Sequence, residues 1–239
     1  MTVHLVGAGP GDPELISVRG ARLLASADVV VHDRLARPLL PLAAPGAEIV
    51  DVGKSPGSAP VPQSEINRIL VEAGRRYACV VRLKGGDPLV FGRGAEEAAA
   101  LAAAGVPFDV VPGISSVLAA PAAAGVPVTV RGTSRSFTVL TGHEDPELIP
   151  LAWWEALVTL GGTIVVLMGA SNIAGIADRL CSAGMPAATP VAAVHAATTP
   201  AQHVHRSTLD RIGAIPVPSP ATIVIGDVAA IDLRSVPGV

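Results

Sequence analysis

The chain has 239 residues, of which half are hydrophobic, 15% are charged and only 3% are aromatic, and its formal net charge is −3. Its Gly and Pro residues are spread among apolar runs, which excludes collagen-like and disordered chains. The shortage of aromatic residues and the slightly acidic balance argue against a nucleic-acid partner. The two isolated cysteines have no metal-ligand spacing, so no metal site is expected.

The most apolar stretch, Leu160 to Ala170, is about half as long as a membrane-spanning helix must be. The first residues lead directly into a strand pattern, without the basic and apolar regions of a secretory leader. We therefore expect a cytoplasmic protein with no membrane partner.

Short β-branched runs alternate with Ala- and Leu-rich stretches along the whole chain, separated by Gly or Pro. The sequence predicts strands at Val3–Val6, Val29–His32, Ile49–Val52, Val80–Leu83, Phe108–Val111, Phe137–Thr141, Thr163–Met168, Pro190–His195, Gln202–Ser207 and Ala221–Ile225. Helices are expected at Ser17–Ala27, Ser64–Arg76, Gly94–Ala104, Ser115–Ala124 and Asn172–Ala183, with a further helix start near Trp153.

This alternation is typical of α/β lobes with largely parallel sheets. Because little helix separates the last two predicted strands, we expect the second sheet to be mixed. The lobe boundary is placed near Pro112-Gly113, which gives an N-terminal lobe at 1–112 and a C-terminal lobe at 113–239.

The first glycine-rich turn, Gly7-Ala-Gly-Pro-Gly-Asp-Pro13, follows the first strand and lets a ligand approach the backbone. It is similar to a dinucleotide-binding fingerprint, and Asp33 after the second strand could be the ribose-binding acid. However, Asp12 stands where the third glycine is needed, and Pro10 has no amide hydrogen to donate. A structural turn and a binding loop remain equally open for this motif.

The second motif runs from Val81 to Gly94 and turns through Gly85-Gly86-Asp87-Pro88. Ligands of open α/β sheets bind at the carboxyl ends of strands, where this turn lies, and a carboxylate there can bind a ribose or an amino group. The alternative is a β-turn that starts the next helix, and we favour binding. In a third motif, Ser115 and Ser116 follow another strand, where their hydroxyls could cap a helix or bind a ligand.

Six motifs occur in a fixed order along the chain. They are Gly-Ala-Gly-Pro-Gly-Asp-Pro at 7–13, His-Asp-Arg-Leu at 32–35, Val-Gly-Lys at 52–54, Val-Pro-Gln-Ser-Glu-Ile-Asn at 61–67, Arg-Leu-Lys-Gly-Gly-Asp-Pro-x-x-Phe-Gly-Arg-Gly at 82–94 and Val-Val-Pro-Gly-Ile-Ser at 110–115. Together they resemble the motifs of the tetrapyrrole methylases, and the resemblance extends from about Val3 to Val228. Within that family the set is most similar to the enzymes that methylate uroporphyrinogen III.

The resemblance implies a two-lobed α/β fold, a sheet flanked by helices in each lobe, an active site in the cleft between the lobes, and a homodimer. The implied cofactor is S-adenosyl-L-methionine, which leaves as S-adenosyl-L-homocysteine. By motif match its contacts fall on Pro10, Gly85, Gly86, Asp87, Val90, Ser115, Ser116, Met168 and Ala197. The family's proton acceptor matches Asp33, and its proton donor matches Lys54.

The implied reaction methylates uroporphyrinogen III at C2 and C7 to give precorrin-2, for sirohaem or cobalamin synthesis. The pyrrole carbons of this reduced macrocycle are electron-rich, so no activated side-chain nucleophile is needed. A proton must leave after methyl transfer, and a carboxylate such as Asp33 suits general base catalysis. Arginines suit the substrate carboxylates, and the candidates are Arg34, Arg37, Arg93 and Arg131. Arg82, Lys84 and Arg135 are further cations, and about half of the whole set is expected on the solvated surface.

Two departures from the family pattern keep other functions open. The loop Ser55–Pro60 lacks the usual basic or His residues, and Val130 stands where His is common. One alternative is therefore a later corrin-pathway C-methyltransferase. Another is a non-catalytic nucleotide- or tetrapyrrole-binding module. For His203 and His205, surface or packing roles are favoured over metal binding.

Overall fold

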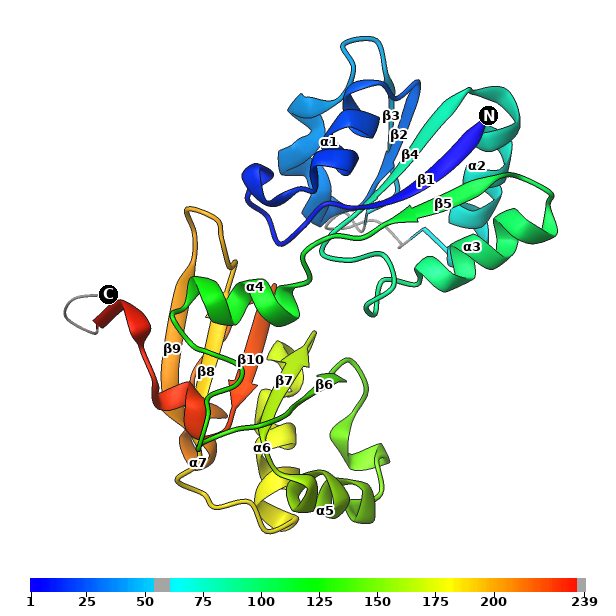
Figure 1. Cartoon of the computed structure of the whole chain (residues 1–239). Coiled ribbons are helices and arrows are strands. Elements are labelled where there is room, and N and C mark those ends of the chain that lie inside the picture. Colours follow the sequence, from blue (N-terminus) through cyan, green and yellow to red (C-terminus); the bar gives the residue numbers. More distant parts are fainter. Residues whose placement is uncertain (54–60, 236–239) are drawn as a thin grey trace. The chain divides into compact units, whose positions relative to one another are not determined.

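The computed structural model describes residues 1–53 and 61–235. The chain divides into two compact units, Met1–Ser115 and Ser116–Val239, each with its own sheet and its own core (Figure 1). Lys54 and the loop Ser55–Pro60 lie outside the described residues. Within the described part of the chain, no helix has the length and apolarity needed to cross a membrane.

The first unit contains a parallel five-stranded sheet in the order β3-β2-β4-β1-β5. Its strands are β1 (Thr2–Gly7), β2 (Val29–His32), β3 (Glu48–Asp51), β4 (Cys79–Lys84) and β5 (Phe108–Val111). Because all five run the same way, their carboxyl ends lie along one edge of the sheet.

Helices cover both faces of this sheet (Figure 1). They are α1 (Val18–Ala25), α2 (Gln63–Arg76) and α3 (Gly94–Ala103), with a 3₁₀ segment at Arg34–Leu42. Side chains of a strand alternate between faces, so Val80 of β4 packs towards α2 and α3, whereas Val81 packs towards α1 and the 3₁₀ segment. Pro38 and Pro41, which lack amide hydrogens, lie in the 3₁₀ segment, which the sequence did not predict.

The second unit contains a mixed five-stranded sheet in the order β6-β7-β10-β8-β9. Its strands are β6 (Phe137–Thr141), β7 (Thr163–Leu167), β8 (Pro190–His195), β9 (His203–Thr208) and β10 (Ala221–Ile225). Only β6 and β7 pair in parallel, and the other pairs are antiparallel. The predicted mixed sheet is therefore confirmed.

Helices also cover both faces of the second sheet. They are α4 (Ser116–Ala123) on one face, and α5 (Leu151–Leu160), α6 (Ile173–Ser182) and α7 (Leu209–Ile212) on the other. Each of the ten predicted strands overlaps an observed one, and the α/β class with helix-flanked sheets is confirmed. One boundary is wrong in an informative way: β7 ends before Met168, whose φ of 56° takes it out of the strand.

Candidate functional site

The three glycine motifs of the first unit meet at the carboxyl edge of its sheet. Gly9 and Gly86 exchange two backbone hydrogen bonds, with N–H to O distances between donor and acceptor of 3.2 and 2.7 Å. The N–H of Gly113 donates to Oδ2 of Asp87 at 3.0 Å. Motifs separated by more than a hundred positions in sequence are thus in direct contact.

Close packing of these turns explains two of the glycines. A Cβ on Gly113 would lie 2.3 Å from the carbonyl oxygen of Gly86 and 2.7 Å from Cα of Gly7. A Cβ on Gly7 would lie 2.5 Å from Cα of Gly113. Both positions exclude any side chain, so structure alone requires glycine there. A binding role is left to Gly85 and Gly86, both of which are partly exposed.

Asp87 organises the loop that it begins. Its Oδ1 accepts from the N–H of Leu89 at 2.8 Å, and its Oδ2 accepts from Gly113. A carboxylate has about four acceptor positions, so Asp87 retains capacity for a ligand's donor groups. The turn is therefore compatible with both interpretations offered by the sequence, helix start and ligand binding.

Asp33 follows β2 at the same edge of the sheet. Its N–H donates to the carbonyl oxygen of Leu83 at 3.3 Å, which places it beside the end of β4. Its Oδ1 accepts from Nη2 of Arg82 at 2.7 Å, and its side chain is 35% exposed. Gly85 lies next to this segment, since a Cβ there would be 3.1 Å from Cβ of Leu35. The structure thus brings Asp33 together with the glycine-aspartate-proline turn.

Arg82 and Lys84 are buried, although the sequence offered them as partners for a substrate carboxylate. Both lie on the face of β4 that α3 covers, and both bind Oε1 of Glu97, at 3.0 and 2.9 Å. Burial lowers the pKa of the Lys84 ammonium, and the nearby positive charge of Arg82 adds to this effect. Both cations are therefore paired with Glu97 in the interior of the first unit and are not exposed to a substrate carboxylate.

The four arginines proposed for substrate binding are all exposed. Arg37 pairs with Asp51, and its hydrogen bond lowers the pKa of that carboxyl. Arg93 pairs with Glu96 at 2.7 Å, and this contact raises the pKa of the guanidinium. Among the described residues, Arg34 and Arg131 form no ion pair. All four can present a guanidinium to a carboxylate, Arg37 and Arg93 by exchanging partners.

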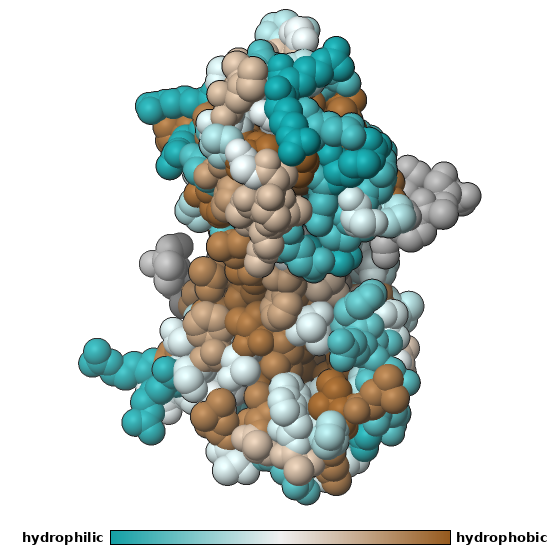
Figure 2. All heavy atoms as spheres, turned by 90° about the vertical axis from the view of Figure 1, so that its right-hand side faces the viewer, coloured by the Kyte–Doolittle hydropathy of each residue, from teal (hydrophilic) through white to brown (hydrophobic). Residues whose placement is uncertain are grey.

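The loop between β4 and α3 has an unusual backbone for residues other than glycine. Phe91 has a φ of 52° and Arg93 a φ of 58°, which places both in the left-handed region. Such strain is common at binding loops. Val90, a predicted cofactor contact, is exposed in this loop. Figure 2 shows that apolar side chains are also exposed over part of one face of the molecule.

Two of the three predicted cofactor residues of the second unit lie in or beside strained turns. Met168 has a φ of 56° and is 47% exposed. Ala197 lies between Ala196 and Thr198, which have φ values of 44° and 65°. Ser116 begins α4. Three of the chain's five left-handed non-glycine residues among those described are therefore at, or adjacent to, predicted contacts of this unit.

The groups in these turns fit S-adenosylmethionine chemically. The partly exposed Asp87 suits a cationic ligand or a ribose hydroxyl, and the glycine turns bring backbone amides and carbonyls within reach. The apolar side chains of Val90 and Met168 are exposed for contact with a nucleoside. Asp87, Val90 and Met168 therefore have side chains that a bound cofactor could contact, whereas Ala197 is buried.

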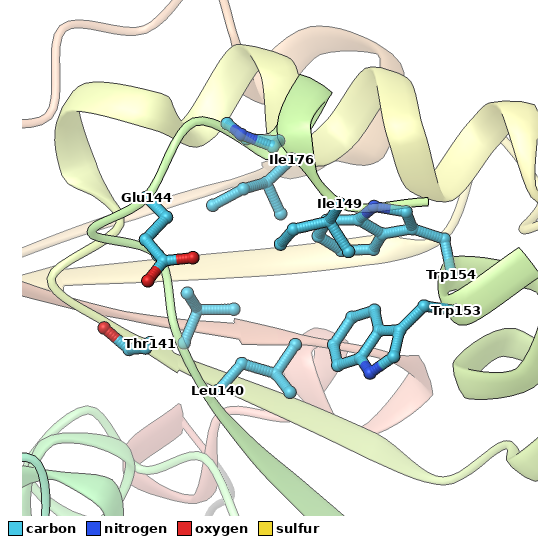
Figure 3. Close-up of a pocket in the computed structure, with 10 residues that line it drawn as sticks. Leu140, Thr141, Glu144, Ile149, Trp153, Trp154 and Ile176 are labelled. Carbon is cyan, nitrogen blue, oxygen red and sulfur yellow. The ribbon is translucent and has the colours of Figure 1, made fainter. Parts of the chain in front are cut away.

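A separate pocket occurs in the second unit, with an empty space of about 290 Å³ that includes open solvent (Figure 3). Trp153 and Trp154 line it, with ring centroids 5.1 Å apart and planes at 85°. Glu144 is the charged side chain among the described residues of its lining. The lining contains none of the predicted site residues, and a carboxylate in an apolar pocket does not suit a polycarboxylate substrate.

Glu97 is a buried charged residue beside Arg82 and Lys84 that the sequence interpretation missed. It is fully buried, whereas its neighbour Glu96 is exposed. A signal was present in the helical spacing, since Gly94, Glu97 and Leu101 are three and four positions apart and share the buried face of α3.

Comparisons with known proteins identify the family of the chain. A family model for Tetrapyrrole (Corrin/Porphyrin) Methylases matches residues 2–213. Over 232 residues the chain is 46% identical to the S-adenosyl-L-methionine-dependent uroporphyrinogen III methyltransferase of Methanosarcina barkeri, covering 95% of this chain and 91% of that protein. It is also 45% identical to the siroheme synthase of Chromobacterium violaceum, covering 95% of this chain but only 49% of that protein.

Among solved structures, the uroporphyrin-III C-methyl transferase from Thermus thermophilus, complexed with S-adenyl homocysteine, superposes with a TM-score of 0.83. It is 40% identical in sequence, and the match covers 96% of this chain and 99% of that one. The matched family model and these relatives, which span nearly the whole chain, lead to one conclusion. The chain belongs to the tetrapyrrole methylase family.

Proposed function

We propose that this protein transfers methyl groups from S-adenosyl-L-methionine to C2 and C7 of uroporphyrinogen III, giving precorrin-2 for sirohaem or cobalamin synthesis. The observation that carries the proposal is the position of a half-exposed carboxylate, Asp33, beside the three interlocked glycine motifs. The names of the close relatives support both the cofactor and the substrate.

The proposed reaction needs no covalent bond between the substrate and a protein side chain. S-adenosylmethionine, when bound, supplies an electrophilic methyl group. An electron-rich pyrrole carbon of the substrate forms the new C–C bond while the bond from sulfur to the methyl carbon breaks. The protein must hold carbon, methyl and sulfur in line, and such orientation can lower the barrier by roughly 7–11 kcal/mol.

The residues have separate roles in this proposal. Pro10, Gly85, Gly86, Asp87, Val90, Ser115, Ser116, Met168 and Ala197 hold the cofactor. Arg34, Arg37, Arg93 and Arg131 bind substrate carboxylates. Asp33 takes the proton that leaves the macrocycle after methyl transfer, and Lys54 returns a proton.

A homodimeric state and a cytoplasmic location also belong to the proposal. Sedimentation equilibrium measures the first, and fractionation of the producing cells measures the second.

A later corrin-pathway C-methyltransferase is the second candidate function. Val130, which stands where the family commonly has His, favours it, because this departure removes a possible partner for a substrate carboxylate. The 46% identity to a protein named for uroporphyrinogen III favours the first candidate.

Incubation with uroporphyrinogen III and methyl-labelled S-adenosylmethionine tests the proposal. We expect a doubly labelled precorrin-2, and an Asp33→Asn variant that binds S-adenosylhomocysteine normally but turns over about 100-fold or more slowly. Absence of labelled product from the wild-type protein would refute the function. A wild-type rate for Asp33→Asn would refute only the role of Asp33.

A further inference from the structure

A buried group of charged side chains lies at the carboxyl edge of the first sheet. It consists of Glu97, Arg82, Lys84 and Asp33, and we call it the Glu97 network. The side chains of Arg82, Lys84 and Glu97 are 2%, 3% and 0% exposed, whereas that of Asp33 is 35% exposed. Asp33 is therefore the member of the network that a substrate can reach.

The Arg82 guanidinium is held on three sides. Its Nε donates to Oε1 of Glu97 at 3.0 Å, and its Nη2 donates to Oδ1 of Asp33 at 2.7 Å. Its Nη1 lies 3.5 and 3.4 Å from the carbonyl oxygens of Val31 and Leu83. Since the guanidinium is planar and rigid, these contacts fix the direction in which Nη2 points. Groups in the interior thus set the position of the Asp33 carboxylate.

Stability alone does not explain how Glu97 is arranged. Its Oε1 accepts from Arg82, from Nζ of Lys84 at 2.9 Å and from Nε2 of Gln63 at 3.4 Å. Its Oε2 is buried without a hydrogen-bond partner among the described residues. An unsatisfied buried oxygen is unfavourable, and apolar residues in place of a buried ion pair are often as stable or more so. An arrangement with this energetic cost points to a role beyond packing α3 on β4.

We propose that Glu97 is a positioning residue: by fixing Arg82, it holds the Asp33 carboxylate in the orientation in which it accepts the substrate proton. The inference rests on the role of Asp33 in the proposed function. Arg82 has no acceptor atom and stays protonated, so the network orients the base but passes no proton. The network contains two carboxylates and two cations. Lys84 pairs with Glu97, and Arg82 is shared between Glu97 and Asp33.

Glu97→Gln tests this role, because it keeps the size of the side chain and removes its charge. We expect kcat for uroporphyrinogen III to fall about 10- to 100-fold, the range in which a misplaced reacting group slows an enzyme. KM for uroporphyrinogen III and the Kd for S-adenosylhomocysteine should stay within about twofold, because the Glu97 side chain is fully buried. An unchanged kcat would overturn the inference.

The matched control is Glu72→Gln on α2, which makes the same chemical change at an exposed ion pair with Arg68. It should leave kcat unchanged. A double-mutant cycle then separates positioning from a general structural effect. In an Asp33→Asn background, Glu97→Gln should cause no further loss of kcat. A second loss of the same size would show that Glu97 acts independently of Asp33, and would overturn the inference.

If Glu97→Gln does not fold, the combined variant Glu97→Gln with Lys84→Met removes both charges of the buried pair. It should fold and still show the reduced kcat, because Arg82 has lost the Glu97 carboxylate that fixes its Nε. A wild-type kcat in this folded variant would overturn the inference. The experiment distinguishes failure of one proposal from failure of the other. A wild-type kcat for Asp33→Asn contradicts the proton-acceptor role. A reduced kcat for Asp33→Asn together with a wild-type kcat for Glu97→Gln contradicts only the role of Glu97.

Discussion

Gly113 lies where the ends of β1, β4 and β5 leave no room for a side chain. Its N–H fixes Asp87, and its Cα faces the carbonyl oxygen of Gly86. The same atoms therefore hold the loop at Gly113 against the loop at Gly86 and determine where the carboxylate of Asp87, a proposed cofactor contact, points. The packing of the loops and the position of Asp87 thus both depend on the close contact between Gly113 and Gly86.

Gly113→Ala should disturb both. The new Cβ would sit 2.3 Å from a backbone oxygen, so the loops must separate, at a cost of about 1–3 kcal/mol in the free energy of unfolding. We also expect weaker binding of S-adenosylhomocysteine, because Asp87 moves with the loop. Urea denaturation and calorimetric titration measure the two effects.

Gly46→Ala provides the matched control, since a Cβ there meets no atom within 4 Å. It should leave ligand affinity unchanged and alter the free energy of unfolding by less than about 1 kcal/mol. Equal stability of the two variants would contradict the packing argument.

The arginines show that residue type alone does not predict which cations are accessible to a substrate carboxylate. Arg82 and Arg93 flank the same motif, and both were candidate ligands for carboxylates. One is buried against Glu97 and the other is exposed beside Glu96. Their places in the fold separate them: Arg82 lies within β4, whose two faces are both covered, whereas Arg93 lies in the exposed loop that precedes α3.

At the scale of elements, the edge pair β8 and β9 carries three histidines on one face. His195 lies opposite His203, and His205 is two positions further along β9. The rings of His203 and His205 are 4.4 Å apart. Burial lowers the pKa of His205, and the neighbouring His203 and His195 lower it further.

This lowered pKa gives stability a predictable pH dependence. Below its ordinary pKa of about 6.5, His205 binds a proton more readily in the unfolded chain than in the folded one. The free energy of unfolding should therefore decrease as the pH falls from about 7 to 5. His205→Gln should flatten this decrease, as measured by urea denaturation at several pH values.

His143→Gln, an exposed change outside this strand pair, is the control and should leave the slope as in the wild type. An identical slope in His205→Gln and the wild type would assign the acid sensitivity to other groups.

At the scale of the whole molecule, most of the fold could be predicted because its strands are short β-branched runs bounded by Gly and Pro. β2, β5, β6, β8 and β10 match their predicted bounds. α5 was harder to delimit, because Leu, Ala, Trp and Val occur all around it and leave no clear polar face. The 3₁₀ segment at Arg34–Leu42 was not predicted, and its two prolines, which lack amide hydrogens, are unfavourable within a helix.

The geometry of the candidate site was predictable to the extent that it consists of local motifs. The turns at Gly9, Gly86 and Gly113 could be found in the sequence, and parallel strands placed them at one edge. The burial of Lys84 and its pairing with Glu97 could not, because that contact joins a strand to a helix thirteen positions later and depends on how α3 packs. Local patterns predict turns, whereas tertiary packing decides which charges are available.

Each unit has a complete sheet and its own core, so each should fold alone. The buried residues of the two cores of the first unit all lie between Val3 and Val111. A fragment of residues 1–115 should therefore give a far-UV circular dichroism spectrum with helix and strand signals and a single cooperative urea transition. A fragment of residues 1–107 is the control. It lacks β5, which pairs with β1, and should unfold at lower urea concentration because one edge of β1 then has no partner strand. If the longer fragment is unfolded, the core of the first unit depends on the rest of the chain.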